Sequence, residues 1–373
     1  MSKTICRHLI VGVLCGVATA RGVDLPAKFL GANSCASSGC HGGGGAKQNQ
    51  FLTWSLKDFH SQRPAATLTT ARSKQIGEAL DIKDPTSEAR CTTCHAPLHD
   101  MAESLRGKDF KVSEGVSCES CHGPSENWLR AHTRHDYTRA DRTAAGMRDL
   151  QDLYVRANTC VACHQVVSQP LLKAGHPELI FELDGQSVAE PRHWGAEKSG
   201  NGAQAWLVGQ AVALREMSWQ LANEQAPTEN EINRWAGLGW LVQNATPNDN
   251  LRQKLPTEPD QAIKAATGLQ SSSDEVARDV AAAPWTDEMT HKMLATLAGT
   301  GAAFRDVSVS QPAQARRAER LVLALDRLVA AENNHKGDVE LNQLFKLAQS
   351  VPDFDAKGFA DALDKYSAAI KAP

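Results

Sequence analysis

The chain has 373 residues, which is long enough for two domains of ordinary size. Its hydrophobic content of 42% and charged content of 22% are those of a globular protein. The formal net charge of −3 argues against non-specific nucleic-acid binding, because such binding needs a basic surface. The aromatic content of 5% is low. We therefore expect something other than aromatic side chains to fill part of the interior.

The N-terminus has the pattern of a signal peptide. Lys3 and Arg7 give a positive start, and an apolar stretch of residues 9–18 follows. Ala18-Thr19-Ala20 fits the rule of small residues before a cleavage site. The stretch is too short to span a bilayer. We predict a signal peptide over residues 1–20, a periplasmic or extracellular location, and no transmembrane segment in the mature chain. The alternative is a buried N-terminal helix.

The cysteines of the mature chain fall into pairs. Of ten cysteines, Cys6 and Cys15 leave with the signal peptide. The other eight form four pairs, and a histidine directly follows the second cysteine of each pair. Three pairs have the spacing C-x-x-C-H, and the first pair has two more residues between its cysteines. The four groups are Cys35/Cys40/His41, Cys91/Cys94/His95, Cys118/Cys121/His122 and Cys160/Cys163/His164.

C-x-x-C-H is the attachment site of c-type haem. The two thiols form thioethers with the two vinyl groups of the porphyrin, and the histidine that follows binds the iron from one face. Zinc sites also use C-x-x-C pairs, but they give no reason for a histidine after every pair. Disulfides suit an exported protein, but they also leave the histidines without a role. We predict four covalently attached c-type haems, with His41, His95, His122 and His164 as proximal ligands of iron.

Six further histidines lie in the segment that carries these motifs: His60, His99, His132, His135, His176 and His193. Four haems in so short a segment imply that the porphyrins themselves form its core. The surplus of histidines indicates a second histidine ligand for most irons, a ligation that gives low potentials. Met101 and Met147 are the competing candidates, because they are the only methionines in the segment.

The sequence around each of the six histidines indicates which of them are the better candidates for distal ligands. His60 is expected to project from a helix that follows the first motif, and His132 follows the third motif closely. Pro and Gly beside His176 and His193 suggest fixed loop geometry. We predict distal ligands at these four positions. His99 and His135 are the reserve candidates, His99 because it lies too near His95 and His135 because it lies one helical turn after His132.

The stretches CASSGCHGG, TWSLKDFHSQ, CTTCHAPLH, GVSCESCHGPSENWLRAH, CVACH, AGHPELIFEL and PRHW resemble a family of multihaem cytochromes c. This family is related to the tetrahaem electron acceptor of hydroxylamine oxidoreductase. The resemblance covers roughly residues 31–220 and implies a tetrahaem electron carrier with mainly bis-histidine haems in stacked pairs. It also implies distal ligands in the motifs of His60, His132, His176 and His193. One departure is that no cysteine follows Cys163, whereas many relatives carry a further haem motif there.

The rest of the chain, residues 201–373, has apolar residues at helical spacing and contains no cysteine. We predict a bundle of five to seven helices, with breaks at Pro227, Pro247–Asn248, Ser271–Ser273 and Pro352. Helices are expected to begin at Thr286 and at Ser310. Trp206, Trp219, Trp235 and Trp240 are expected to lie in its core, and His291 and His335 to face solvent.

The fold expected is therefore mainly α. A haem-packed cytochrome domain with few or no strands, residues 31–198, precedes the helical C-terminal domain of residues 201–373. The favoured function is an exported electron carrier that exchanges single electrons with redox partner proteins. The alternative is a multihaem oxidoreductase that acts on a small nitrogen or sulfur compound at one open haem. A third role, docking of the helical tail on a larger complex, stays open.

Overall fold

The computed structural model describes residues 26–45, 48–193, 202–224, 226–332, 336–349 and 353–371. Within these ranges the secondary structure consists of 16 α-helices and six short 3₁₀-helices, and two isolated β-bridges take the place of a sheet. The expectation of a mainly α fold is thus confirmed. The predicted signal peptide, Trp194 and His335 lie outside the described residues.

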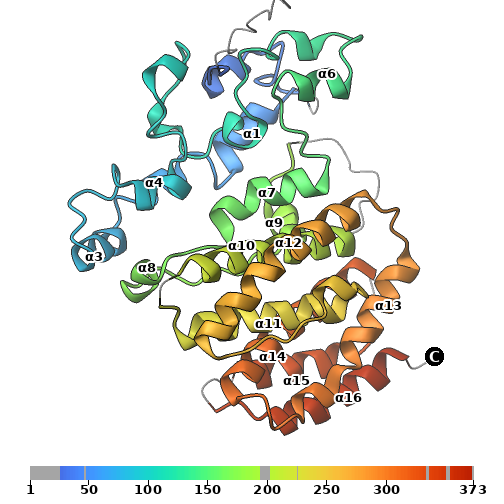
Figure 1. Ribbon diagram of the computed structural model, residues 1–373. Helices are drawn as coiled ribbons and strands as arrows, with labels where there is room; N and C mark the ends of the chain where they lie inside the picture. The colour runs from blue at the N-terminus through green and yellow to red at the C-terminus, as the bar shows by residue number, and fades with distance from the viewer. Residues whose placement is uncertain are drawn as a thin grey trace, which may run out of the picture.

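The N-terminal segment, residues 26–193, consists of short helices joined by long connections and forms one end of the molecule (Figure 1). Its elements are η1 (Ala32–Cys35), α1 (Gln50–Lys57), α2 (Arg63–Thr67), α3 (Ala71–Ala79), α4 (Ala89–His95), η2 (Glu103–Leu105), η3 (Val112–Glu114), α5 (Cys118–His122), η4 (Ala131–Thr133), α6 (Arg139–Ala144), α7 (Leu153–His164), α8 (Gln169–Lys173) and α9 (Leu183–Ala189).

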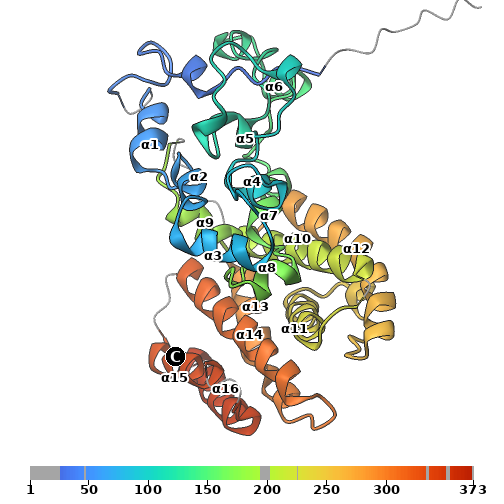
Figure 2. The ribbon, with the colours of Figure 1, turned by 90° about the vertical axis from the view of Figure 1, so that its left-hand side faces the viewer.

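The helical segment, residues 202–371, forms the other end (Figure 2). Its elements are α10 (Gly202–Asn223), α11 (Glu229–Ala245), η5 (Asp249–Leu251), α12 (Pro259–Ala282), α13 (Asp287–Ala298), η6 (Thr300–Phe304), α14 (Gln311–Glu332), α15 (Asp338–Ala348) and α16 (Ala356–Lys371). Helix α10 is buried over most of its length, from Trp206 to Leu214 without interruption. It packs against α11, α12 and α14 on one side and against α7 and α9 of the N-terminal segment on the other.

The apolar core is unevenly shared between the two segments. The one hydrophobic cluster found among the described residues begins at Ala157 on α7 and continues through the helical segment to Ile370. Before Ala157, buried apolar side chains are few and scattered, with Trp54 and Trp128 the largest. The helices that carry the first three cysteine pairs are therefore not held by a core of their own side chains.

The helical segment agrees with the sequence-based expectations at most points. Seven α-helices lie within its described residues, and Thr286 caps α13 by accepting a hydrogen bond from the backbone N–H of Met289. The predicted break at Ser271–Ser273 is wrong, because α12 runs through it. The Ser273 side chain is buried and donates to the carbonyl of Leu269 at 2.6 Å, so its hydroxyl is satisfied inside the helix.

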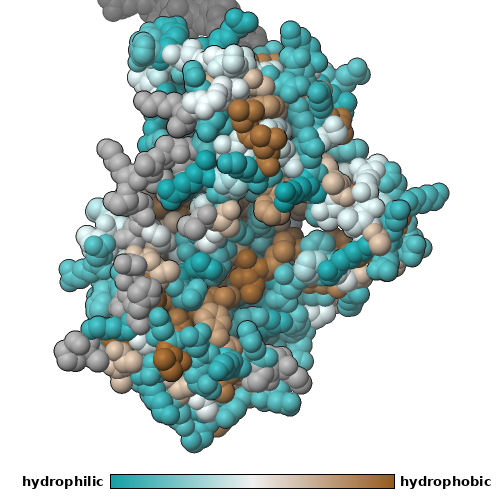
Figure 3. All heavy atoms as spheres, turned by 180° about the vertical axis from the view of Figure 1, so that it is seen from behind, coloured by the Kyte–Doolittle hydropathy of each residue, from teal (hydrophilic) through white to brown (hydrophobic). Residues whose placement is uncertain are grey.

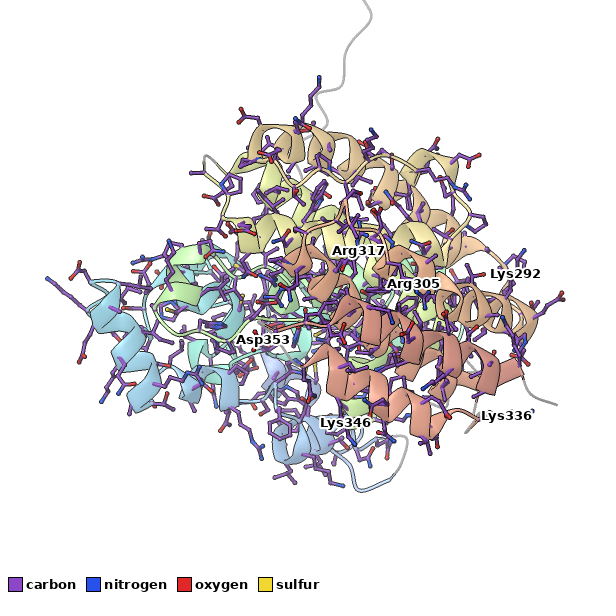
Figure 4. All side chains as sticks on the ribbon, turned by 90° about the horizontal axis from the view of Figure 1, so that it is seen from below. Lys292, Arg305, Arg317, Lys336, Lys346 and Asp353 are labelled. Atoms are coloured by element: carbon purple, nitrogen blue, oxygen red, sulfur yellow. The ribbon has the colours of Figure 1, made fainter. Side chains whose placement is uncertain are left out.

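The tryptophans also depart from expectation at one position. Trp206, Trp235 and Trp240 are buried, but Trp219 is 50% exposed, so it is wrong to place it in the core. His291 faces solvent as expected. Figure 4 shows the molecule from below and labels several charged residues of the helical segment. One of them, Arg305, forms ion pairs with Asp361 and Asp364 of α16.

The rear face carries two apolar areas, one on the N-terminal segment and one across the middle of the helical segment (Figure 3). Leu56, on helix α1, and Phe59, in the turn after it, are the most exposed large apolar side chains among the described residues before residue 300. Among the described helices, none has the length and apolar character that a membrane crossing requires.

Candidate haem-binding site

Three of the four cysteine pairs lie on helices that end at the histidine of the motif. Helix α4 carries Cys91, Cys94 and His95, and helices α5 and α7 carry the next two groups in the same way. Residues three and four positions apart lie on one face of a helix. Each helix therefore presents two thiols and one imidazole to the same side, as attachment of a haem through two thioethers and one iron ligand requires.

Local capping fixes where these helices start. The side chain of Asp152 accepts hydrogen bonds from the backbone N–H groups of Tyr154 and Val155 at the start of α7. At the start of α5 the Ser120 hydroxyl accepts a hydrogen bond from the backbone N–H of Ser117, and the carboxylate of Glu88 caps α4. The motif residues are thus held at the last turn of helices whose first turns are well satisfied.

In the first motif, which has two more residues between its cysteines, a turn brings Cys40 and His41 back toward Cys35. Cys35 ends η1, and the backbone N–H of His41 donates to its carbonyl at 3.1 Å. Cys40 is held by a further bond from its N–H to the carbonyl of Ser37, at 2.9 Å. At Gly42 a Cβ atom would lie 1.9 Å from the carbonyl oxygen of Ala36, so a side chain is excluded there. The two extra residues are absorbed without moving His41 away from Cys35.

Thiols of different motifs lie next to one another. The Cys35 thiol interacts with the Cys118 thiol, which lowers the pKa of Cys35 and raises that of Cys118. The Cys94 thiol interacts in the same way with Cys163, which lowers the pKa of Cys94 to about 7. The first motif is therefore adjacent to the third, and the second motif to the fourth.

The buried Glu119 and the partly buried Glu114 hold the first and third motifs together. Glu119, the residue after Cys118, is 1% exposed and accepts hydrogen bonds from the backbone N–H groups of Leu30 and Gly31 at 2.9 and 2.7 Å. Glu114 accepts from the N–H of Ala32 at 3.1 Å. Because carboxylates are strong acceptors of backbone hydrogen bonds, these contacts fix residues 30–32, just before Cys35, against the third motif.

Each proximal histidine of three motifs faces one of the predicted distal histidines. The ring centroids of His41 and His132 are 6.0 Å apart, and their planes are within 15° of parallel. The His164 ring lies 6.0 Å from that of His60, with the planes at 89°. His95 lies 6.4 Å from His176, with the planes at 78°. In every case the two residues are far apart in the sequence.

The fourth predicted proximal histidine, His122, is buried, and His193, His41 and His132 lie near enough for their charges to lower its pKa. Burial lowers the pKa of His122 to about 4, and the charge of His193 is the next cause. Burial also lowers the pKa of His95 and of His164. The neutral imidazole that burial favours is the form whose free nitrogen lone pair can bind a metal.

The Nδ1 atoms of most of these histidines contact neutral oxygen atoms. His95 contacts the carbonyl of Pro64 at 3.0 Å, His132 that of Trp128 at 3.2 Å and His176 that of Pro177 at 2.8 Å. His41 contacts the side-chain oxygen of Gln50 at 3.0 Å. These contacts fix the proton on Nδ1 and leave Nε2 free, an arrangement usual for metal-binding histidines.

The position of His60 differs from the expectation. Helix α1 ends at Lys57, so His60 lies in the following turn and not on the helix. Asp58 fixes that turn: its Oδ1 atom accepts from the His60 backbone N–H at 2.8 Å and contacts Nδ1 at 3.1 Å. The ring is held by a carboxylate of the turn instead of by a helix.

The two reserve histidines are placed differently. His99 forms an ion pair with the exposed carboxylate of Asp100, with Nδ1 and Oδ1 at 2.8 Å. His135 is exposed to solvent. The three ring pairs described above include neither of them.

A carboxylate group missed by sequence reasoning lies between two of the distal histidines. Asp58, Glu190 and His193 place one ligand atom each within 4.8 Å of one another. Burial acts to raise the pKa of Asp58, but hydrogen bonds from His60 outweigh it and lower that pKa. Burial and the charge of Asp58 raise the pKa of Glu190 to about 7. Residue 58 and residue 190 are too far apart in the sequence for any local pattern to connect them.

The helical segment holds the loop that carries His176. Glu178, two residues later, forms ion pairs with Arg234 of α11 at 2.8 Å and with Arg316 of α14 at 3.4 Å. The Gln210 side chain donates to the carbonyl of Phe181 at 2.9 Å. The first helix of the helical segment, α10, packs on α7 and α9 of the N-terminal segment, and α10, α11 and α14 together fix the chain that follows His176.

The comparison with protein families gives one match, which agrees with these motifs. Residues 34–123 match the family described as cytochrome c554 and c-prime. None of the curated proteins or solved structures compared matches the chain. The matched range holds the first three cysteine pairs with their histidines. Together with the helices that end at His95 and His122, this match supports a c-type cytochrome that carries covalently bound haem.

Proposed function

We propose that the protein is an exported tetrahaem c-type cytochrome, which transfers single electrons along closely packed, mainly bis-histidine haems. The observation that carries this proposal is that three predicted proximal histidines each lie opposite one predicted distal histidine. These pairs are His41 with His132, His95 with His176, and His164 with His60. We propose His193 as the partner of His122, because it is the first of the nearby charges that lower the pKa of His122.

The separation of the rings fits one metal atom between them. A metal bound to an imidazole nitrogen lies about 2.0–2.1 Å from it, so two opposed rings on one metal have centroids roughly 6 Å apart. The three measured separations, 6.0, 6.0 and 6.4 Å, match this value. The donor set, two thiols and two imidazoles for each site, suits a c-type haem.

The scarcity of apolar side chains in the N-terminal segment points the same way. A haem is a large apolar disc, and four of them would supply the core that the scattered side chains before Ala157 do not. In this proposal the exposed side chains of Leu56 and Phe59 lie at the edge of the haem core. This accounts for a segment whose short helices have few contacts with each other.

The residues of the chain have distinct tasks in this proposal. Each haem, when bound, supplies one-electron chemistry at its iron. The thiols fix the position of the group, and the Nδ1 contacts orient the imidazoles toward it. Adjacent cysteines, such as Cys35 with Cys118 and Cys94 with Cys163, support close packing of the first site with the third and of the second with the fourth.

Mass spectrometry of the exported protein tests the number of haems. We expect the mass of the polypeptide after cleavage plus four haem masses. Three haems would mean that the spread first motif is not used. N-terminal sequencing of the same sample should begin near Arg21, because Ala18-Thr19-Ala20 is the expected cleavage site. A chain that keeps Met1 would contradict the export part of the proposal.

An oxidoreductase that works at an open haem requires an iron face without a protein ligand. The four proposed histidine pairs favour the electron carrier over that alternative. Addition of cyanide to the oxidised protein distinguishes the two functions. A carrier with histidine on both faces should show no rapid spectral change, whereas an enzyme with one open iron should bind cyanide at one haem in four.

A further inference from the structure

Asp58 stands out among the groups that contact the histidine pairs. Its side chain is 3% exposed, and its Oδ1 atom accepts from both the backbone N–H and the ring Nδ1–H of His60. Two donors on one oxygen atom fix the ring of His60 relative to its own backbone. The same turn holds Ser61, whose backbone forms a β-bridge with Gly115.

This partner is chemically unlike those of four other paired histidines. His41, His95, His132 and His176 contact carbonyl or amide oxygen atoms, which carry no formal charge. At His60 the acceptor is a carboxylate, and it is buried. A hydrogen bond to an ionised acceptor is stronger than one to a neutral acceptor, and burial strengthens it further.

We propose that Asp58 is a positioning residue for His60, which sets both the orientation of this imidazole and its strength as an electron donor. The inference rests on the proposed function, since it requires His60 to be the distal ligand opposite His164. A carboxylate that draws the Nδ1 proton makes the ring a more basic ligand. A more basic axial ligand stabilises the ferric state and lowers the reduction potential. The haem at Cys160 and Cys163 is therefore tuned below the potential that a neutral partner at residue 58 would give.

Glu190 extends the same cluster to a second site. Its carboxylate lies beside Asp58, and its Oε1 atom is 3.9 Å from Nδ1 of His193. Residue 190 directly follows α9, which packs on α10, so the helical segment helps to place it. The Asp58 carboxylate thus stands between the predicted distal histidines of two different motifs. It hydrogen-bonds both His60 and the Glu190 carboxyl group, and of the two histidines it bonds His60.

Two variants of Asp58 separate charge from position. Asp58→Asn keeps an oxygen acceptor for the Nδ1–H but removes the negative charge. We expect all four haems to stay low-spin, while one of the four reduction potentials moves upward. Asp58→Ala removes the acceptor altogether. We expect it to release the His60 ring and to convert up to one haem in four to high spin. The readouts are a spectroscopic redox titration and electron paramagnetic resonance of the oxidised protein.

Asp100→Asn is the matched control. Asp100 contacts Nδ1 of His99 at 2.8 Å, as Asp58 contacts His60, but His99 belongs to none of the pairs. This variant should leave the potentials and spin states unchanged. An equal shift in Asp100→Asn would mean that general charge and not the contact with His60 sets the potential, and would overturn the inference.

His60→Ala separates failure of this inference from failure of the proposed function. If His60→Ala produces a high-spin haem but Asp58→Asn leaves every potential unchanged, the role of Asp58 is wrong and the ligation stands. If His60→Ala keeps four low-spin haems, His60 is not a ligand, and both statements fail. If Asp58→Ala is not exported in folded form, Asp58→Asn still decides the question, because Asn preserves the hydrogen-bond acceptor.

Discussion

The rings of His41 and His132 lie 6.0 Å apart and nearly parallel, although the first follows a cysteine pair near the start of the N-terminal segment and the second lies on η4. Trp128, buried one turn before His132, contacts the His132 ring edge-on at 5.5 Å, and its carbonyl contacts Nδ1. The distal ring is thus held from both sides while Nε2 stays free.

His132→Ala should convert one haem in four to high spin and raise its reduction potential, because the loss of a basic axial donor destabilises the ferric state. Electron paramagnetic resonance and a redox titration measure the two effects. His135→Ala is the control, since His135 is exposed and belongs to no pair. If the His135 variant becomes high-spin and the His132 variant does not, the two histidines have been assigned in the wrong order.

Glu178→Gln should loosen the loop that carries His176. The change removes the charge that pairs with Arg234 and Arg316, at a cost to stability of about 1–3 kcal/mol. We expect a lower melting temperature and a high-spin fraction that grows on warming in the haem of Cys91 and Cys94. Glu319→Gln is matched to it, because Glu319 pairs with Arg316 without contacting that loop. If both variants lower the melting temperature and raise the high-spin fraction equally, the cause is the loss of an ion pair on α14 and not the release of the His176 loop.

The double variant Cys35→Ser/Cys40→Ser should reduce the haem count from four to three. The turn at Ser37 and Gly42 keeps His41 near Cys35 in spite of the longer spacing, so the first motif should be used. Mass spectrometry of the exported chain gives the count. The double variant Cys91→Ser/Cys94→Ser should lose one haem as well. An unchanged mass of attached haem in the first double variant would exclude attachment at the spread motif.

Asp184→Asn should stabilise the protein near neutral pH. Burial raises the pKa of Asp184 to about 6, and its Oδ1 atom has no hydrogen-bond partner among the described residues. The unfolded chain therefore ionises this group at a lower pH than the folded protein does. Stability is consequently lost as the pH rises between about 4 and 6, by up to about 3 kcal/mol.

Denaturant unfolding of the Asp184→Asn variant and the unaltered protein checks this sign. The advantage of the variant should be small near pH 4 and should increase toward pH 7. Asp353→Asn serves as control, because Asp353 is exposed on the connection before α16 (Figure 4). An advantage that is constant over this pH range would show that burial of the charge is not its cause.

The proximal half of the site could be predicted from the sequence, because two thiols and an imidazole within five residues form a local pattern. The structure adds that three of these patterns lie on helices that end at His95, His122 and His164, so the thiols and the imidazole share one helical face. The distal partners could be proposed as a set but not matched to motifs. His60 faces His164, the histidine of the last motif, and nothing in the local sequence relates the two.

Other features depend on tertiary contacts that no periodicity reveals. Asp58 is buried beside Glu190, which is distant in the sequence. Glu178 forms ion pairs with two arginines, Arg234 of α11 and Arg316 of α14. Ser271–Ser273 has the composition of a break, but α12 continues because the Ser273 hydroxyl bonds to its own helix and packs inside the bundle. Long-range packing decided each of these cases.

The spin state of the four irons in the oxidised, exported protein tests the central claim most directly. Electron paramagnetic resonance, with the signals integrated against the haem content, gives the number of low-spin and high-spin sites. The proposed pairing of His41, His95, His122 and His164 with four distal histidines predicts that all the iron is low-spin. A high-spin signal that accounts for one haem or more in four would contradict the electron carrier, because it would reveal the open iron face that the oxidoreductase requires.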